Sequence, residues 1–141
     1  MYSTHNPPGI APPSSAYTHG VRADGATSWL HISGQVGTHA DGSLAGDSAQ
    51  QMEVCWQRIM AVLADAGMNM GNIVKVTVFL TRPEDVGLYR QIRDRYLNGH
   101  LTASTLLIVS GLADPAWTVE IEAVAARFTE NTNPTGETGG A

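Results

Sequence analysis

The chain has 141 residues, of which 43% are hydrophobic and 15% charged, and its formal net charge is −5. A chain of this length fits one domain with a modest core, and so few charges favour a surface partly covered by self-association. Lys75 is the only lysine and no Lys/Arg cluster exists, which argues against a nucleic-acid partner.

The two ends differ in composition from the rest of the chain. Residues 1–15 contain four prolines, which predict an extended N-terminal segment rather than a packed element, and residues 129–141 are polar and predict a disordered tail. Residues 16–128 are expected to form one domain. The N-terminus lacks the basic and apolar regions of a signal peptide, and no apolar run reaches the roughly 20 residues of a membrane span. With a single cysteine, Cys55, we expect a cytoplasmic protein without a membrane partner.

In chain order, the first expected unit is a hairpin. The stretches 16–25 and 28–37 read as two strands, and Asp24-Gly25 between them is a turn signal. A helix follows, beginning with a capping box at Ser48 and Gln51 and ending at Gly67. Its buried stripe is predicted from apolar side chains at helical spacing, namely Met52, Cys55, Trp56, Ile59, Leu63 and Ala66.

The second half alternates in the same way. Residues 72–81 predict a strand with Val74, Val76 and Val78 on one face, and Thr81 with Glu84 predicts the start of a second helix that ends at Asn98-Gly99. Its stripe comprises Val86, Tyr89, Ile92, Tyr96 and the aliphatic stem of Arg93. Residues 104–112 and 118–128 predict two final strands. The order β-β-α-β-α-β-β predicts an α/β fold with both helices on one face of a sheet.

That architecture leaves the second sheet face uncovered. In the last strand, Glu120 and Glu122 point away from Val119 and Ile121, and in the second strand Trp29, His31 and Ser33 share a face. Such a face is too apolar for water and too polar for a monomer core. It favours a closed homo-oligomer with polar groups lining clefts between subunits.

Four stretches carry a resemblance to a known family: "AYTHGV" (16–21), "ISGQVG" (32–37), "IVKVTVFLTRPEDVGLYRQIRDRYL" (73–97) and "TASTLLIVSGLADPAWTVEIEA" (102–123). Together they resemble the Rid (YjgF-like) family, whose best-known members are enamine/imine deaminases. The resemblance implies a chorismate-mutase-like α/β fold and a homotrimer whose sheets form an inner β-barrel. It also implies a small-molecule substrate bound in a cleft at each subunit interface.

The resemblance also suggests a site. Tyr17 matches a cleft tyrosine, Ser33 with Gly34 matches the serine that borders the cleft, and Glu120 matches the glutamate thought to position water. Where the family has an arginine that binds the substrate carboxylate, this chain has Ser104, followed by Thr105. A hydroxyl cannot make the bidentate contact of a guanidinium, so an altered substrate specificity is expected.

Each candidate also has a structural interpretation. Glu120 could be satisfied by hydrogen bonds at a subunit interface, and Glu122 could form a salt bridge between subunits. Tyr17 could serve only in aromatic packing. His31 reads first as a satisfied core histidine and second as an acid/base group in the cleft. Arg90, on the second helix, is either a solvated charge or a new anchor that replaces the missing arginine.

Two functions of different classes follow. The first is hydrolysis of a small reactive imine or enamine to a carbonyl compound and ammonia, with Glu120 orienting or deprotonating the water. The second is a non-catalytic trimeric module that binds a small metabolite or another protein. The sequence has no metal-ligand cluster, phosphate loop, dinucleotide fingerprint or nucleophile elbow, so no metal or cofactor is predicted.

Overall fold

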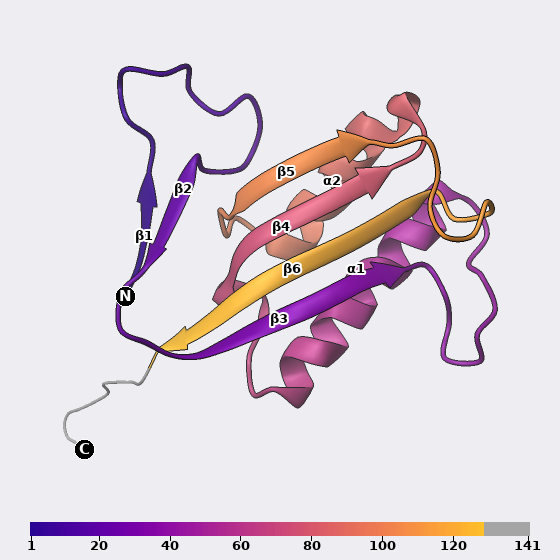
Figure 1. Cartoon of the computed structure of the whole chain (residues 1–141), viewed down its shortest axis with the longest axis horizontal. Coiled ribbons are helices and arrows are strands. Elements are labelled where there is room, and N and C mark those ends of the chain that lie inside the picture. The colour runs from indigo at the N-terminus through magenta and orange to yellow at the C-terminus, as the bar shows by residue number, and fades with distance from the viewer. Residues whose placement is uncertain (129–141) are drawn as a thin grey trace.

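The computed structural model describes residues 1–128, and the predicted tail at 129–141 lies outside them. Two helices cover one face of a four-stranded sheet, and the opposite face is open (Figure 1). The elements are β1 (Tyr2–His5), β2 (Gly20–Ala23), β3 (Ala26–Val36), α1 (Ser48–Asp65), β4 (Ile73–Leu80), α2 (Val86–Leu97), β5 (Ala103–Ile108) and β6 (Val119–Phe128), with short 3-10 turns at Met70–Asn72 and Pro83–Asp85.

The main sheet has the strand order β3-β6-β4-β5, with β5 parallel to β4 and the other neighbours antiparallel. The predicted α/β fold with both helices on one sheet face is therefore confirmed. The core lies between the sheet and the helices, where alternate residues of β6 and β4 meet the apolar stripes of α1 and α2. Its fully buried members include Met52, Trp56, Leu63, Val76, Val78, Tyr89, Val119 and Ile121.

The predicted N-terminal hairpin is wrong. Strand β2 pairs with β1, in the register Tyr2 opposite Ala23, and β3 pairs with β6 instead. The backbone N–H of Asp24 donates to the carbonyl of Met1 at 2.9 Å, so β2 finds its hydrogen-bond partners in the N-terminal segment. That segment was predicted to hold no packed element, and β1 corrects this expectation. The domain limits at residues 15 and 128 stay predictions.

Both predicted helix starts are also corrected. The N-cap of α1 is Asp47, whose side chain and that of Gln50 form the capping box, one residue before the predicted pair. Helix α2 begins at Val86 after the 3-10 turn. The N-cap of that turn is Arg82 and the N-cap of α2 is Asp85, and neither side chain makes a capping hydrogen bond, so the predicted start at Thr81 and Glu84 is replaced. The predicted ends are confirmed, since Gly67, Asn98 and Gly99 all have positive φ angles.

Candidate functional site

Glu120 lies on the open face of the sheet, as the alternation in β6 predicted. Its neighbours Val119 and Ile121 are fully buried against the helices, whereas the Glu120 side chain is half-buried on the other side. In register, it lies between Val36 of β3 and Phe79 of β4. None of the ion pairs within residues 1–128 involves Glu120. The carboxylate thus stands on a semi-apolar surface without a charged partner in the described chain.

Gly34 contacts this carboxylate directly. A Cβ atom placed on Gly34 would lie 1.9 Å from Glu120 Oε2 and 2.8 Å from its Cδ, so the carboxylate occupies the space that any other side chain would fill. The pairing of β3 with β6 shifts register here, because Ile32 lies opposite Ala123 and Gln35 opposite Ile121. Ser33 and Gly34 therefore form a β-bulge across from one residue of β6. The bulge, together with the absence of a Cβ atom at Gly34, allows the Glu120 carboxylate to contact the backbone of β3.

The remaining candidates on the open face are more exposed. Ser33 and Glu122 are exposed, and so is His31, which corrects its interpretation as a core histidine. Thr105 accepts a hydrogen bond from the Lys75 ammonium group at 2.7 Å. This face also carries apolar side chains, with Trp29 53% and Leu107 43% exposed. The predicted mixture of polar and apolar groups on the open face is confirmed.

A second group of candidates lines a pocket of about 190 Å³ beside α2. Ser104 lies next to Val76 in the parallel pair β4-β5 and therefore points to the helix side of the sheet. Tyr17 reaches the same pocket because the backbone N–H of Thr18 donates to the carbonyl of Thr102 at 2.9 Å, which holds this segment beside the start of β5. Arg90 of α2 completes the set. Three residues predicted to bind the substrate thus line one pocket.

Arg93 is a pocket residue that sequence reasoning missed. It was predicted to lie in the apolar stripe of α2, and it is indeed 3% exposed, but it also lines the pocket with Arg90. Its Nε donates to Asp94 Oδ1 at 2.9 Å, and its buried Nη2, although 2.9 Å from the same oxygen, makes no hydrogen bond. The available signal was the spacing: Arg90 and Arg93 are three residues apart and so share a helix face.

The two groups lie on opposite sides of the sheet in one chain. Ser33, Gly34 and Glu120 border the open face, whereas Tyr17, Arg90, Arg93 and Ser104 line the pocket on the helix side of β5. Ser104 and Thr105, adjacent in sequence, point to opposite faces. One chain therefore does not bring Glu120 and Ser104 together.

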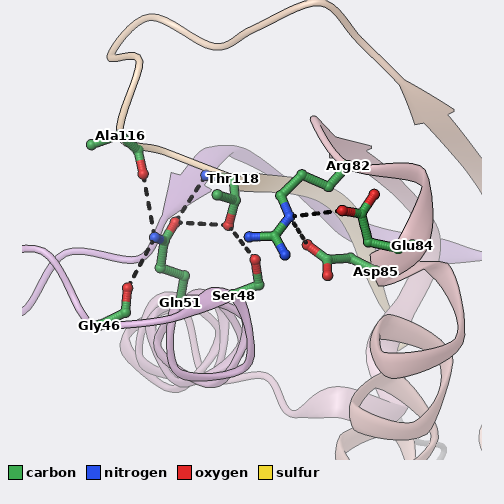
Figure 2. A network of polar contacts seen from close by, with 8 residues as sticks. All are labelled: Gly46, Ser48, Gln51, Arg82, Glu84, Asp85, Ala116 and Thr118. Atoms are coloured by element: carbon green, nitrogen blue, oxygen red, sulfur yellow. Dashed lines mark hydrogen bonds and ion pairs between the residues drawn. The ribbon is translucent and has the colours of Figure 1, made fainter.

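A network of polar contacts holds the start of β6 in place (Figure 2). Gln51 is 2% exposed, and its Oε1 accepts hydrogen bonds from the backbone N–H of Thr118 at 2.9 Å and from its hydroxyl at 3.2 Å. The Ser48 hydroxyl donates to the Thr118 hydroxyl at 2.9 Å. Ser48 and Gln51 do not cap α1 because they bind this loop instead. The network fixes the backbone two residues before Glu120.

Comparisons with known proteins identify the family of this chain and support its fold. The mouse protein "2-iminobutanoate/2-iminopropanoate deaminase" is 32% identical over 127 residues, which cover 89% of this chain and 88% of that one. The rat protein of the same name is 31% identical over 79% of this chain and 80% of its own. A crystal structure of the Rid-family protein YyfB from Yersinia pestis superposes with a TM-score of 0.81 at 27% identity, covering 89% of this chain and 98% of that one. The family model described as Endoribonuclease L-PSP matches residues 9–127, and the chain belongs to this family, the Rid (YjgF-like) proteins.

Proposed function

We propose that this protein hydrolyses a small reactive imine or enamine to a carbonyl compound and ammonia. The observation that carries the proposal is the Glu120 carboxylate, which lies on Gly34 without a charged partner in residues 1–128. A carboxylate partly removed from water is costly unless it is used or paired. The names of the mouse and rat relatives supply the reaction type, since both are imine deaminases.

The reaction needs one water and one base. Glu120 accepts a proton from water as the oxygen attacks the carbon of the C=N bond, and passes this proton to the nitrogen to give a carbinolamine. Glu120 then accepts the proton of the carbinolamine hydroxyl and passes it to the amine, so the C–N bond breaks and ammonia leaves as the C=O bond forms. The balance is one imine and one water to one carbonyl compound and one ammonia. A positioned general base of this kind contributes about 10²- to 10⁴-fold to the rate.

The site of this reaction is a cleft between subunits of a homotrimer. Glu120 and the pocket lie on opposite sides of the sheet, so packing of the open faces against one another would leave each Glu120 near a neighbour's β5 edge. The exposed Trp29 and Leu107 favour such packing, because burial of apolar surface drives association. Ser104 in place of an arginine changes how the substrate is held, and hence the substrate specificity.

Nucleic acid is not part of this proposal, although the family description contains the word endoribonuclease. The chain carries 8 basic against 13 acidic side chains, and phosphate binding needs clustered cations. Within residues 1–128 no helix is long and apolar enough to cross a membrane. A cytoplasmic location is part of the proposal, since it fits a protein that removes reactive metabolic intermediates.

The test is a coupled assay with 2-iminopropanoate generated in the cuvette, together with imines that lack a carboxylate. We expect the protein to accelerate carbonyl release over the buffer rate, and Glu120→Gln to remove about 10²-fold or more of that acceleration. Glu84→Gln is the matched control, since Glu84 is exposed and lies on the turn before α2. Absence of turnover with every imine would contradict the proposal and favour the non-catalytic binding module.

A further inference from the structure

The pocket beside α2 has an unusual charge balance. Its lining residues include Arg90, Arg93, Tyr17 and Ser104, but no aspartate or glutamate. Arg90 forms none of the ion pairs within residues 1–128, and Arg93 is partnered only by Asp94, whose side chain is 49% exposed. Two arginines therefore line a small cavity whose lining residues include no acidic side chain.

Arg93 gives this pocket a built-in anion-binding group. Its side chain is 4% exposed, and Nη2 lies 2.9 Å from Asp94 Oδ1 in the one ion pair that Arg93 forms within residues 1–128. That partner is a half-exposed carboxylate outside the pocket lining, and a buried cation is stable only with counter-charge and hydrogen bonds around it. An anion that enters the pocket would give the guanidinium a second partner. A planar carboxylate suits the guanidinium fork, which binds two oxygens at once.

We propose that Arg93, assisted by Arg90, binds the carboxylate of the substrate from helix α2, in place of an arginine at position 104. The inference rests on the proposed function in treating this pocket as part of the substrate cleft. The new part is the source of the anchor on α2, since the names of the mouse and rat relatives already denote imines of small carboxylic acids. Ser104 then has a different consequence from the one expected from the sequence. A small residue at this position leaves space for the substrate carboxylate to reach the helix.

A purely structural role for Arg93 makes a different prediction. If its stem only packs in the core and its tip only pairs with Asp94, substitution would lower stability but would not change the preference for a charged ligand. The ratio of affinities for an acid and its neutral ester therefore separates the two roles. Pyruvate and methyl pyruvate are suitable probes, because they share the carbonyl skeleton of the expected product and differ in the charge.

Titration calorimetry on the full chain at low salt tests the proposal. We expect pyruvate to bind about tenfold to a hundredfold more tightly than methyl pyruvate, as hydrogen bonds to a charged group predict. Arg93→Gln and Arg90→Gln should each reduce this ratio, and Arg93→Lys should restore only part of it because an ammonium group cannot form the fork. Arg95→Gln is the control, because Arg95 lies on the same helix but pairs with Glu53 outside the pocket.

Thermal melting of each variant identifies loss of folding, and Arg90→Gln keeps the test valid if the buried Arg93 cannot be replaced. Equal affinity for the acid and the ester would overturn the proposal, as would a ratio unchanged in both glutamine variants or the absence of pyruvate binding at millimolar concentrations. Turnover by the unmodified chain separates this inference from the reaction. A preference for pyruvate in an unmodified protein that turns over no imine would leave the anion site standing and reject the hydrolase.

Discussion

Substitution of Gly34 by alanine should damage the site while leaving the fold almost intact. The new Cβ would lie 1.9 Å from Glu120 Oε2, against an ordinary contact of 3.4 Å or more, so reaching such a contact needs a separation larger by 3.4 − 1.9 = 1.5 Å. The atoms that must move are the far end of a half-exposed side chain, so we expect a change of less than about 1 kcal/mol in the free energy of unfolding. Displacement of a catalytic group by about 1 Å can cost about 10²-fold in rate.

The assay is steady-state imine hydrolysis by Gly34→Ala, together with a denaturant titration of the same sample. We expect kcat to fall by about 10²-fold while the unfolding midpoint stays near that of the unmodified chain. Gly111→Ala is the matched control, because a Cβ there meets nothing within 4 Å and the residue is exposed. Full activity in Gly34→Ala would refute the reasoning that the contact between Gly34 and the carboxylate sets the position of Glu120.

Three further predictions concern the rest of the fold. Burial raises the pKa of the Cys55 thiol to about 12. A thiol reagent at pH 8 should therefore leave the native protein unlabelled but label the protein unfolded in guanidinium. Rapid labelling of the native state would contradict this. Gln51→Leu leaves the Thr118 N–H without its acceptor and should lower the free energy of unfolding by about 2–3 kcal/mol, measured by urea titration; an unchanged midpoint would show that the network is dispensable. Leu107→Glu adds a charge to the open sheet face and should convert the proposed homotrimer into monomers in analytical ultracentrifugation, whereas a trimer that persists would place the interface elsewhere.

The parts of the fold that could be predicted are those where local pattern and burial agree. Alternation in β6 assigned Glu120 and Val119 to opposite faces, and the stripe from Met52 to Leu63 placed α1 on the sheet. Both patterns arise from periodicity against a single buried surface, so a short window of sequence contains them. The helix ends at Gly67 and Asn98 followed from the backbone conformations that these residues favour.

The errors arose where a distant partner competed with a local signal. Asp24-Gly25 is a sound turn signal, but β2 pairs with β1 and not with the strand that follows the turn. Ser48 and Gln51 have the spacing of a capping box, yet both side chains bind Thr118, about 70 residues further on. No local pattern contains these contacts.

Arg93 shows the same limit at the candidate site. An arginine in an apolar stripe reads as a packed stem, which is correct for most of the side chain. Whether its tip faces solvent or a pocket depends on β5 and on the segment before Tyr17, and neither is close in sequence. The sequence did place Tyr17, Ser104 and Arg90 among the candidates, and the structure brings these three to one pocket.

The central claim is that Glu120 of one subunit works with the α2 pocket of a neighbour, and a mixed-trimer experiment tests it most directly. Glu120→Gln chains, which should lose the catalytic base, and Arg93→Gln chains, which should bind the substrate weakly, are co-expressed with different tags. The mixed assemblies, trimers in this account, are purified through both tags and assayed at low substrate concentration. Because a cleft built from two subunits can combine the unmodified halves, each mixed trimer has one intact cleft of its three, and about a third of the activity should return. Activity that stays at the level of the separate variants would contradict an intersubunit site.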